Sequence, residues 1–165
     1  MWIVPHAQDD NASHRWILAI EASNPSADPD PGMASVAGAV LGTNGRPGEI
    51  VEIAYEAGSR ERDGLLPAIE SVRAALDVRR SALARFCVSR GPGGYTGLRV
   101  SVTVAKSLAH ATGASLVGVP SATVAIGEDR PATQFCVCLA SKGTRTHVTA
   151  FADPERPDGQ PIGVL

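Results

Sequence analysis

A glycine-rich stretch between an apolar segment and a long helical pattern constrains the fold of this 165-residue chain more than any other feature. The stretch reads RGPGGYTGLR over residues 90–99 and follows the apolar segment 86–89. Glycine adopts backbone angles closed to other residues, and proline favours turns. Apolar residues then recur at helical spacing over 98–111. The sequence therefore predicts a strand, a tight glycine loop and a helix, with Thr96 as the N-cap and Gly113 as the stop.

The start of this helix is also a candidate anion or nucleotide site. Backbone N–H groups at a helix start bind anions, and two arginines flank the loop. The alternative is a tight turn that only positions the helix. This alternative is favoured, because the stretch has no P-loop Lys-Ser/Thr pair and no full G-x-G-x-x-G. An acid closes the first strand, where acids face either a ligand crevice or solvent. The candidate site residues are Glu21, Arg90, Gly91, Gly93, Gly94, Thr96, Gly97 and Arg99.

The helix over 98–111 is apolar over an unusually wide arc. Its apolar and small residues cover roughly 200°, about twice what one sheet-packing face requires. They fall on two adjacent faces, which are Leu98, Val102, Ala105 and Ala109 on the first and Val100, Val104, Leu108 and Ala111 on the second. The helix therefore lies inside its own domain, or packs on its sheet and on a partner at once. The predicted partner surface comprises Leu65, Leu66, Ile69, Leu98, Val102, Ala105 and Ala109.

Composition limits the class of protein. With 44% hydrophobic residues, 165 residues form one large domain, or one domain and part of another. A net charge of −2 lacks the general electrostatic footprint of a nucleic-acid-binding domain. No apolar run reaches membrane-spanning length, and no signal peptide is evident, so we expect a cytoplasmic protein. The three cysteines, Cys87, Cys136 and Cys138, are expected to be small reduced core residues that bind no metal.

The order of the predicted elements indicates an α/β domain with a mixed five-stranded sheet. Strands are predicted over 16–22, 33–41, 49–56, 86–89 and 115–119, helices over 63–76, 98–111 and 121–126, and two further strands over 134–140 and 146–152. Asn44-Gly45 predicts the hairpin turn between the second and third strands, and Asp63 is a candidate cap of the first helix. The predicted domains are a flexible tail over 1–15, an N-terminal domain over 16–127, the start of a second domain over 134–152 and a flexible tail over 153–165.

Five stretches resemble, in the same order and spacing, the bacterial TsaB/YeaZ family. They read ILAIEAS at 17–23, LLPAI at 65–69, SRGPGGYTGLR at 89–99, AKSLA at 105–109 and LVGVPS at 116–121. Family members take part in making threonylcarbamoyladenosine in tRNA and were long labelled glycoprotease-like peptidases. The resemblance implies an actin-like ATPase fold, related to ribonuclease H, with two similar domains. Glu21 stands where the family has aspartate, and the sequence holds only the start of a second domain, so the resemblance is to a divergent and short member.

The resemblance also implies a role without catalysis. The family protein pairs with a TsaD-like transferase through the helices that correspond to 63–76 and 98–111, and a TsaE-like ATPase joins the pair. It implies a homodimer when no partner is present, contact with tRNA only through the complex, and no membrane association. No cofactor, catalytic residue or metal ligand is expected on this chain, because the family places ATP and metal on the partner proteins.

Two other functions remain open from the residues. An actin-like nucleotide-binding phosphotransferase needs an acid on the first strand, which Glu21 supplies, and a second glycine-rich phosphate loop, which is not evident. A peptidase is the less favoured alternative, because neither H-E-x-x-H nor G-x-S-x-G occurs.

Overall fold

The computed structural model describes residues 15–23, 33–57, 64–127, 133–140, 145–152 and 160–164. Residues 1–14 of the predicted tail over 1–15, residues 153–159 and 165 of the predicted tail over 153–165, and the candidate cap Asp63 lie outside these residues.

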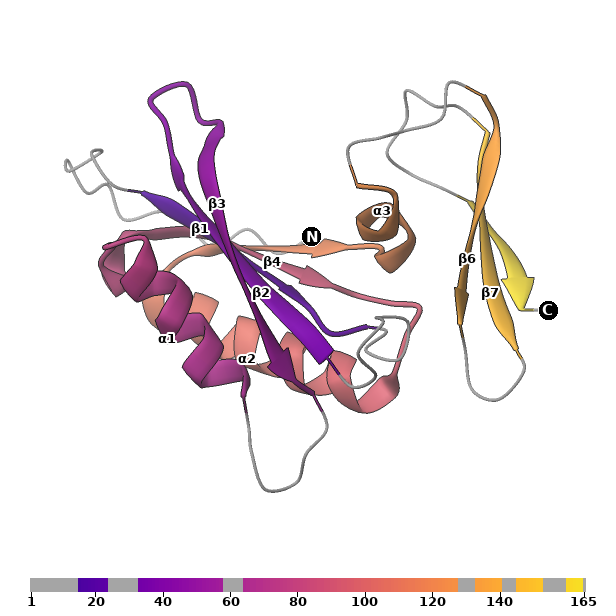
Figure 1. The fold of residues 1–165 in the computed structure, drawn as a ribbon, viewed down its shortest axis with the longest axis horizontal. Helices are drawn as coiled ribbons and strands as arrows, with labels where there is room; N and C mark the ends of the chain where they lie inside the picture. The colour runs from indigo at the N-terminus through magenta and orange to yellow at the C-terminus, as the bar shows by residue number, and fades with distance from the viewer. Residues whose placement is uncertain are drawn as a thin grey trace.

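A mixed five-stranded sheet is the centre of the fold (Figure 1). Its strands are β1 Trp16–Glu21, β2 Met33–Leu41, β3 Pro47–Glu56, β4 Leu83–Ser89 and β5 Ser115–Val119. They lie in the order β3-β2-β1-β4-β5. The β1, β2 and β3 strands pair antiparallel, whereas β1 with β4 and β4 with β5 pair parallel. The mixed five-stranded α/β sheet predicted from the sequence is therefore confirmed.

The helices follow the predicted order. They are α1 Leu65–Ala75, α2 Tyr95–Thr112 and the short α3 Ser121–Ile126, and a 3₁₀ turn, η2 Arg80–Ala82, precedes β4. The α1 and α2 helices lie on the same side of the sheet (Figure 1). The α1 helix contacts β2 and β3, and α2 contacts β4 and β5.

One hydrophobic core fills the space between the sheet and the two long helices. Every second residue of β1 is buried, and Leu18 and Phe86 are fully enclosed. The helices contribute Leu65 and Val72 from α1 and Ala105 from α2 to the same core. Burial of this apolar surface is the main force that holds both helices against the sheet.

The glycine loop joins β4 to α2 and packs against the end of β1. The N–H of Gly94 donates a hydrogen bond to the carbonyl oxygen of Ser23. A Cβ atom at Gly93 would overlap that same carbonyl group, and a Cβ at Gly97 would overlap the carbonyl oxygen of Ala22. Glycine is required at Gly93 in the loop and at Gly97 in the first turn of α2, because the backbone there lies directly on the residues that follow β1.

The helix α2 begins three residues before the predicted start. The prediction of Thr96 as N-cap is wrong, because Gly94 is the N-cap and no side chain caps the helix. The end was predicted correctly, since Gly113 closes α2 in the left-handed conformation with φ 72°. The hairpin turn at Asn44-Gly45 is also confirmed, with Gly45 at φ 73° between β2 and β3.

A second, antiparallel sheet of three strands follows the five-stranded sheet in the chain. It contains β6 Phe135–Ala140, β7 Thr146–Phe151 and β8 Gln160–Val164. The strand β8 lies in the predicted flexible tail over 153–165, so that prediction is wrong for residues 160–164. The stacked rings of Phe135 and Phe151, with centroids 5.0 Å apart, join β6 to β7. In Figure 1, α3 lies between the two sheets.

The cysteines do not all lie in the core. Cys87 on β4 is partly buried, but Cys136 and Cys138 on β6 are exposed. The prediction of three core cysteines is therefore wrong for the last two. Side chains two residues apart on a strand point to the same face, so the exposure of one accompanies that of the other.

Gly97→Ala should lower the free energy of unfolding by about 1–3 kcal/mol, because the new Cβ overlaps Ala22 and forces α2 away from β1. This loss exceeds the gain of about 1 kcal/mol that alanine offers inside a helix. The control is Gly94→Ala, whose Cβ would lie 3.6 Å from the oxygen of Ser23, so its loss should be smaller. Urea unfolding measures both, and a Gly97→Ala protein as stable as the wild type would contradict this packing.

Iodoacetamide should alkylate Cys136 and Cys138 before Cys87 in the folded protein at neutral to mildly alkaline pH. Burial raises the pKa of the Cys87 thiol, an effect that the nearby Arg85 only partly opposes. Since the thiolate is the nucleophile, a raised pKa slows alkylation. Mass spectrometry follows each site, and denaturation in urea should make the three rates similar. Faster alkylation of Cys87 in the folded protein would contradict its burial.

The raised pKa of Cys87 also makes the free energy of unfolding depend on pH. The folded state holds the Cys87 proton more tightly than the unfolded state, because burial disfavours the charged form. The contribution of the Cys87 thiol to the free energy of unfolding is full below the unfolded pKa of about 8.5, and it is lost as the pH rises through the folded pKa.

Candidate functional site

The carboxylate of Glu21 lies at the edge where the parallel strands end. Its Oε1 accepts hydrogen bonds from the backbone N–H of Ser23, at 2.7 Å, and from the Ser23 hydroxyl. Its Oε2 is buried and has no hydrogen-bond partner among the described residues. The side chain is therefore bound to the turn that follows its own strand and is not a freely solvated strand end.

Several groups of the predicted anion or nucleotide site already make contacts with other residues of the chain. The N–H of Gly94 is bonded to Ser23, and the N–H of Arg90 donates to the carbonyl of Val119 at 2.9 Å. The guanidinium of Arg99 lies over the ring of Tyr95, 5.4 Å from its centroid. These contacts favour the interpretation of the loop as a turn that positions α2. Anion or nucleotide binding stays a prediction for the whole set, Glu21, Arg90, Gly91, Gly93, Gly94, Thr96, Gly97 and Arg99.

The predicted partner surface divides into buried and exposed residues. Leu65, Ala105 and Ala109 are 1%, 0% and 6% exposed and belong to the core, so these side chains do not face a partner. The prediction that these three side chains belong to a partner surface is wrong, because they point to the sheet. Leu66, in contrast, is 49% exposed on α1.

Three further residues of the predicted surface, Ile69, Leu98 and Val102, are partly exposed. Of these, Ile69 and Val102 also pack against the core. The interface itself stays a prediction.

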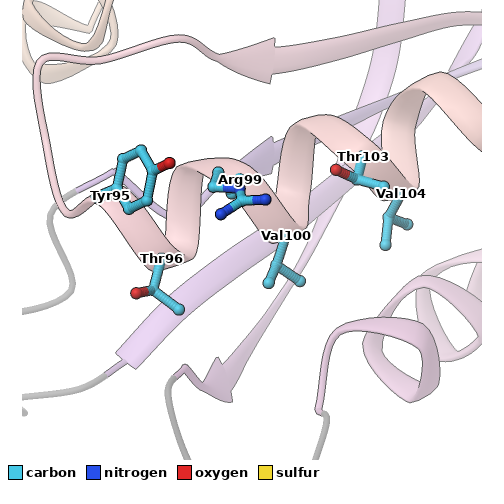
Figure 2. A pocket seen from close by; sticks show the side chains of 6 residues that line it. All are labelled: Tyr95, Thr96, Arg99, Val100, Thr103 and Val104. Atoms are coloured by element: carbon cyan, nitrogen blue, oxygen red, sulfur yellow. The ribbon is translucent and has the colours of Figure 1, made fainter.

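The structure adds residues of α2 that the predicted surface left out. Tyr95 and Val100 are 72% and 43% exposed. A shallow groove is lined by Tyr95, Thr96, Arg99, Val100, Thr103 and Val104 (Figure 2). Val100 and Val104 project from the same side of α2 in this view. The signal was present in the sequence, because these two valines belong to the second apolar face of the helix.

The orientation of α2 explains which of its sides remains open. Gly97 faces Ala22, the residue directly after β1, and Val104, seven residues later, lies on the same side of the helix. That side faces β1, beyond which β2 carries α1. The sheet does not cover the part of the α2 surface that runs from the side facing β1, around the outside of the helix, to the opposite flank.

No group of three or more His, Cys, Asp or Glu side chains that would hold a metal ion occurs within the described residues. The helices in this part of the chain are also too short or too polar to cross a membrane.

Comparison with known proteins relates the sequence to proteins of tRNA threonylcarbamoyladenosine biosynthesis. Residues 55–158 match the family model described as "TsaD: tRNA N6-adenosine threonylcarbamoyltransferase". A probable bifunctional tRNA threonylcarbamoyladenosine biosynthesis protein from Halobacterium salinarum is 37% identical over 98 residues, which cover 58% of this chain and 18% of the relative. The tRNA threonylcarbamoyladenosine biosynthesis protein TsaB from Bacillus subtilis is 43% identical over 44 residues, or 27% of this chain and 19% of that protein. The chain thus matches less than a fifth of each curated relative.

Solved structures share the fold of the chain. YeaZ from Pseudomonas aeruginosa aligns with a TM-score of 0.67 at 21% identity, over 92% of this chain and 66% of that chain. A second structure, described as similar to peptidase YeaZ from the same organism, aligns with a TM-score of 0.68 at 20% identity over the same shares. These likenesses agree with the predicted fold class. Because the family model covers more than half of the 165 residues, the chain belongs to the tRNA N6-adenosine threonylcarbamoyltransferase (TsaD) family, in which it is a TsaB/YeaZ-like protein.

Proposed function

We propose that the chain is a non-catalytic subunit of the complex that makes N6-threonylcarbamoyladenosine in tRNA. Two relatives are named for the biosynthesis of this nucleoside. The observation that carries the role of the subunit is the apolar surface of the two long helices. We define the helix surface as Leu66 and Ile69 of α1 with Val100 and Val104 of α2.

The helix surface has the composition of an interface. Leu66 and Val100 are about half exposed, and Ile69 and Val104 are partly exposed beside the core. Full burial of a leucine or valine side chain contributes about 1.5–3 kcal/mol. Several such residues supply the centre of an interface, from which the cost of association is subtracted.

The proposed partner is a TsaD-like transferase, related in fold, and a TsaE-like ATPase completes the complex. In this arrangement ATP and metal belong to the partner proteins, and tRNA reaches this subunit only through the complex. Without the transferase, the same helix surface associates with a second copy of the chain, more weakly than with the transferase. The complex acts in the cytoplasm.

Glutamate in the helix surface should prevent this association. Leu66→Glu or Val100→Glu places a charge on side chains that are 49% and 43% exposed, so the subunit should still fold. The charge would lose its hydration in the interface, and binding to the TsaD-like transferase of the same organism should weaken at least about tenfold, which is about 1.4 kcal/mol. Isothermal titration calorimetry measures the affinity, and circular dichroism verifies the fold.

The matched control is Ile50→Glu on β3, which changes an apolar side chain that is 63% exposed and lies outside the helix surface. This variant should bind the transferase like the wild type. Equal binding by all three variants, or equal weakening in all three, would contradict the proposed role of the two helices.

A further inference from the structure

The exposed part of α2 is basic. Arg99, Lys106 and His110 are exposed, and the sequence of α2 contains no aspartate or glutamate. Their spacing of seven and four residues places them on one side of the helix. We call these three residues the basic stripe. Its sign is opposite to the net charge of −2 of the whole chain.

The ion pairs of the described residues leave the basic stripe uncompensated. Within this part of the chain, they join Glu70 of α1 to Arg73 at 2.7 Å and to Arg80 at 3.0 Å. Hydrogen bonds from Arg73 and Arg80 lower the pKa of Glu70, so its carboxylate is committed to this pair of arginines. Arg99 rests over Tyr95, a contact that leaves its positive charge in place.

The basic stripe and Val104 lie on opposite flanks of α2, with Val100 between them. Val104 shares the side of α2 that faces β1, as Gly97 does. Arg99 and Lys106 lie on the opposite flank, about 140–160° around the helix from Val104 at 100° per residue. A helix that covers Val100 therefore meets apolar side chains along one edge and positive charge along the other.

From this arrangement we propose that the helix surface selects a partner whose docking helix carries carboxylates along the edge that meets the basic stripe. The inference rests on the proposed function for the location of the interface. Opposite charges at the rim of an apolar contact speed association and exclude wrong partners. A second copy of this chain is a weaker partner than such a helix, because pairing of two α2 helices brings two basic stripes together. The carboxylate of α1, on Glu70, is paired with Arg73 and Arg80.

The test is a charge reversal in the basic stripe. The double variant Arg99→Glu, Lys106→Glu, called the acidic variant, changes two exposed side chains and should keep its circular dichroism spectrum. It should bind the TsaD-like transferase of the same organism about tenfold or more weakly than the wild type at about 50 mM salt. At about 500 mM salt, where exposed charges are screened, the difference should largely disappear. The control is Arg46→Glu in the turn after β2, which removes an exposed cation elsewhere. This variant should bind the transferase with the affinity of the wild type at both salt concentrations.

A second arm uses the chain as its own partner. The acidic variant mixed with the wild type should form more heterodimer at low salt than either protein forms homodimer alone, as sedimentation velocity measures. Equal association in the mixture and in the separate proteins would overturn the electrostatic account of self-pairing.

The outcomes separate this inference from the proposed function. If the acidic variant binds the transferase like the wild type while Leu66→Glu does not, the apolar interface stands and the inference falls. If the acidic variant keeps the transferase but loses affinity for an unmodified tRNA transcript, the basic stripe contacts nucleic acid and the acidic-partner inference is overturned. If binding is lost at low salt and recovered at high salt, the inference holds.

Discussion

The packing of the glycine loop on the end of β1 is the constraint on which the rest of the structure depends. The N–H of Gly94 bonds to the carbonyl of Ser23, and the backbones of Gly93 and Gly97 lie against Ser23 and Ala22, the two residues that follow β1. No side chain caps α2, so this contact with a distant strand fixes where the helix starts. It also fixes the rotation of the helix, since Gly97 must face β1.

That rotation decides which residues of α2 are buried. With Gly97 against β1, the small residues Ala105 and Ala109 point to the sheet and allow the helix to lie close to β4 and β5. Val100 is left outside the core, and Arg99 and Lys106 face solvent on the other flank. The exposure of the helix surface on α2 and that of the basic stripe thus both follow from the rotation of α2 about its axis. In this account the glycine loop acts on function indirectly, by orienting a helix.

The sequence predicts the sheet well, because the buried strands are continuous apolar runs separated by glycine and proline turns. It does not predict the start of α2, because the group that binds Gly94 is seventy-one positions earlier in the chain and local capping rules favour Thr96. A helical pattern shows that an apolar arc is too wide for one face, but not which part faces the sheet. For this reason the predicted partner surface includes Ala105 and Ala109, which are buried, and omits Val100, which is exposed.

The second sheet shows the same limit of local reasoning. The strand β8 contains Pro161 and Gly163, residues that weaken a strand signal and are tolerated at a sheet edge. Its pairing with β7 comes from the antiparallel neighbour, which composition does not reveal. The exposure of Cys136 and Cys138 likewise depends on which face of β6 remains uncovered.

The central claim is that the outer sides of α1 and α2 together form the surface that binds the transferase. Hydrogen–deuterium exchange of the chain, alone and in complex with the TsaD-like transferase, tests it most directly. The account predicts slower exchange in peptides that cover Leu65–Ala75 and Tyr95–Thr112, with unchanged exchange in β6 and β7. Protection confined to β6 and β7, or a complex that leaves both helices unchanged, would contradict it.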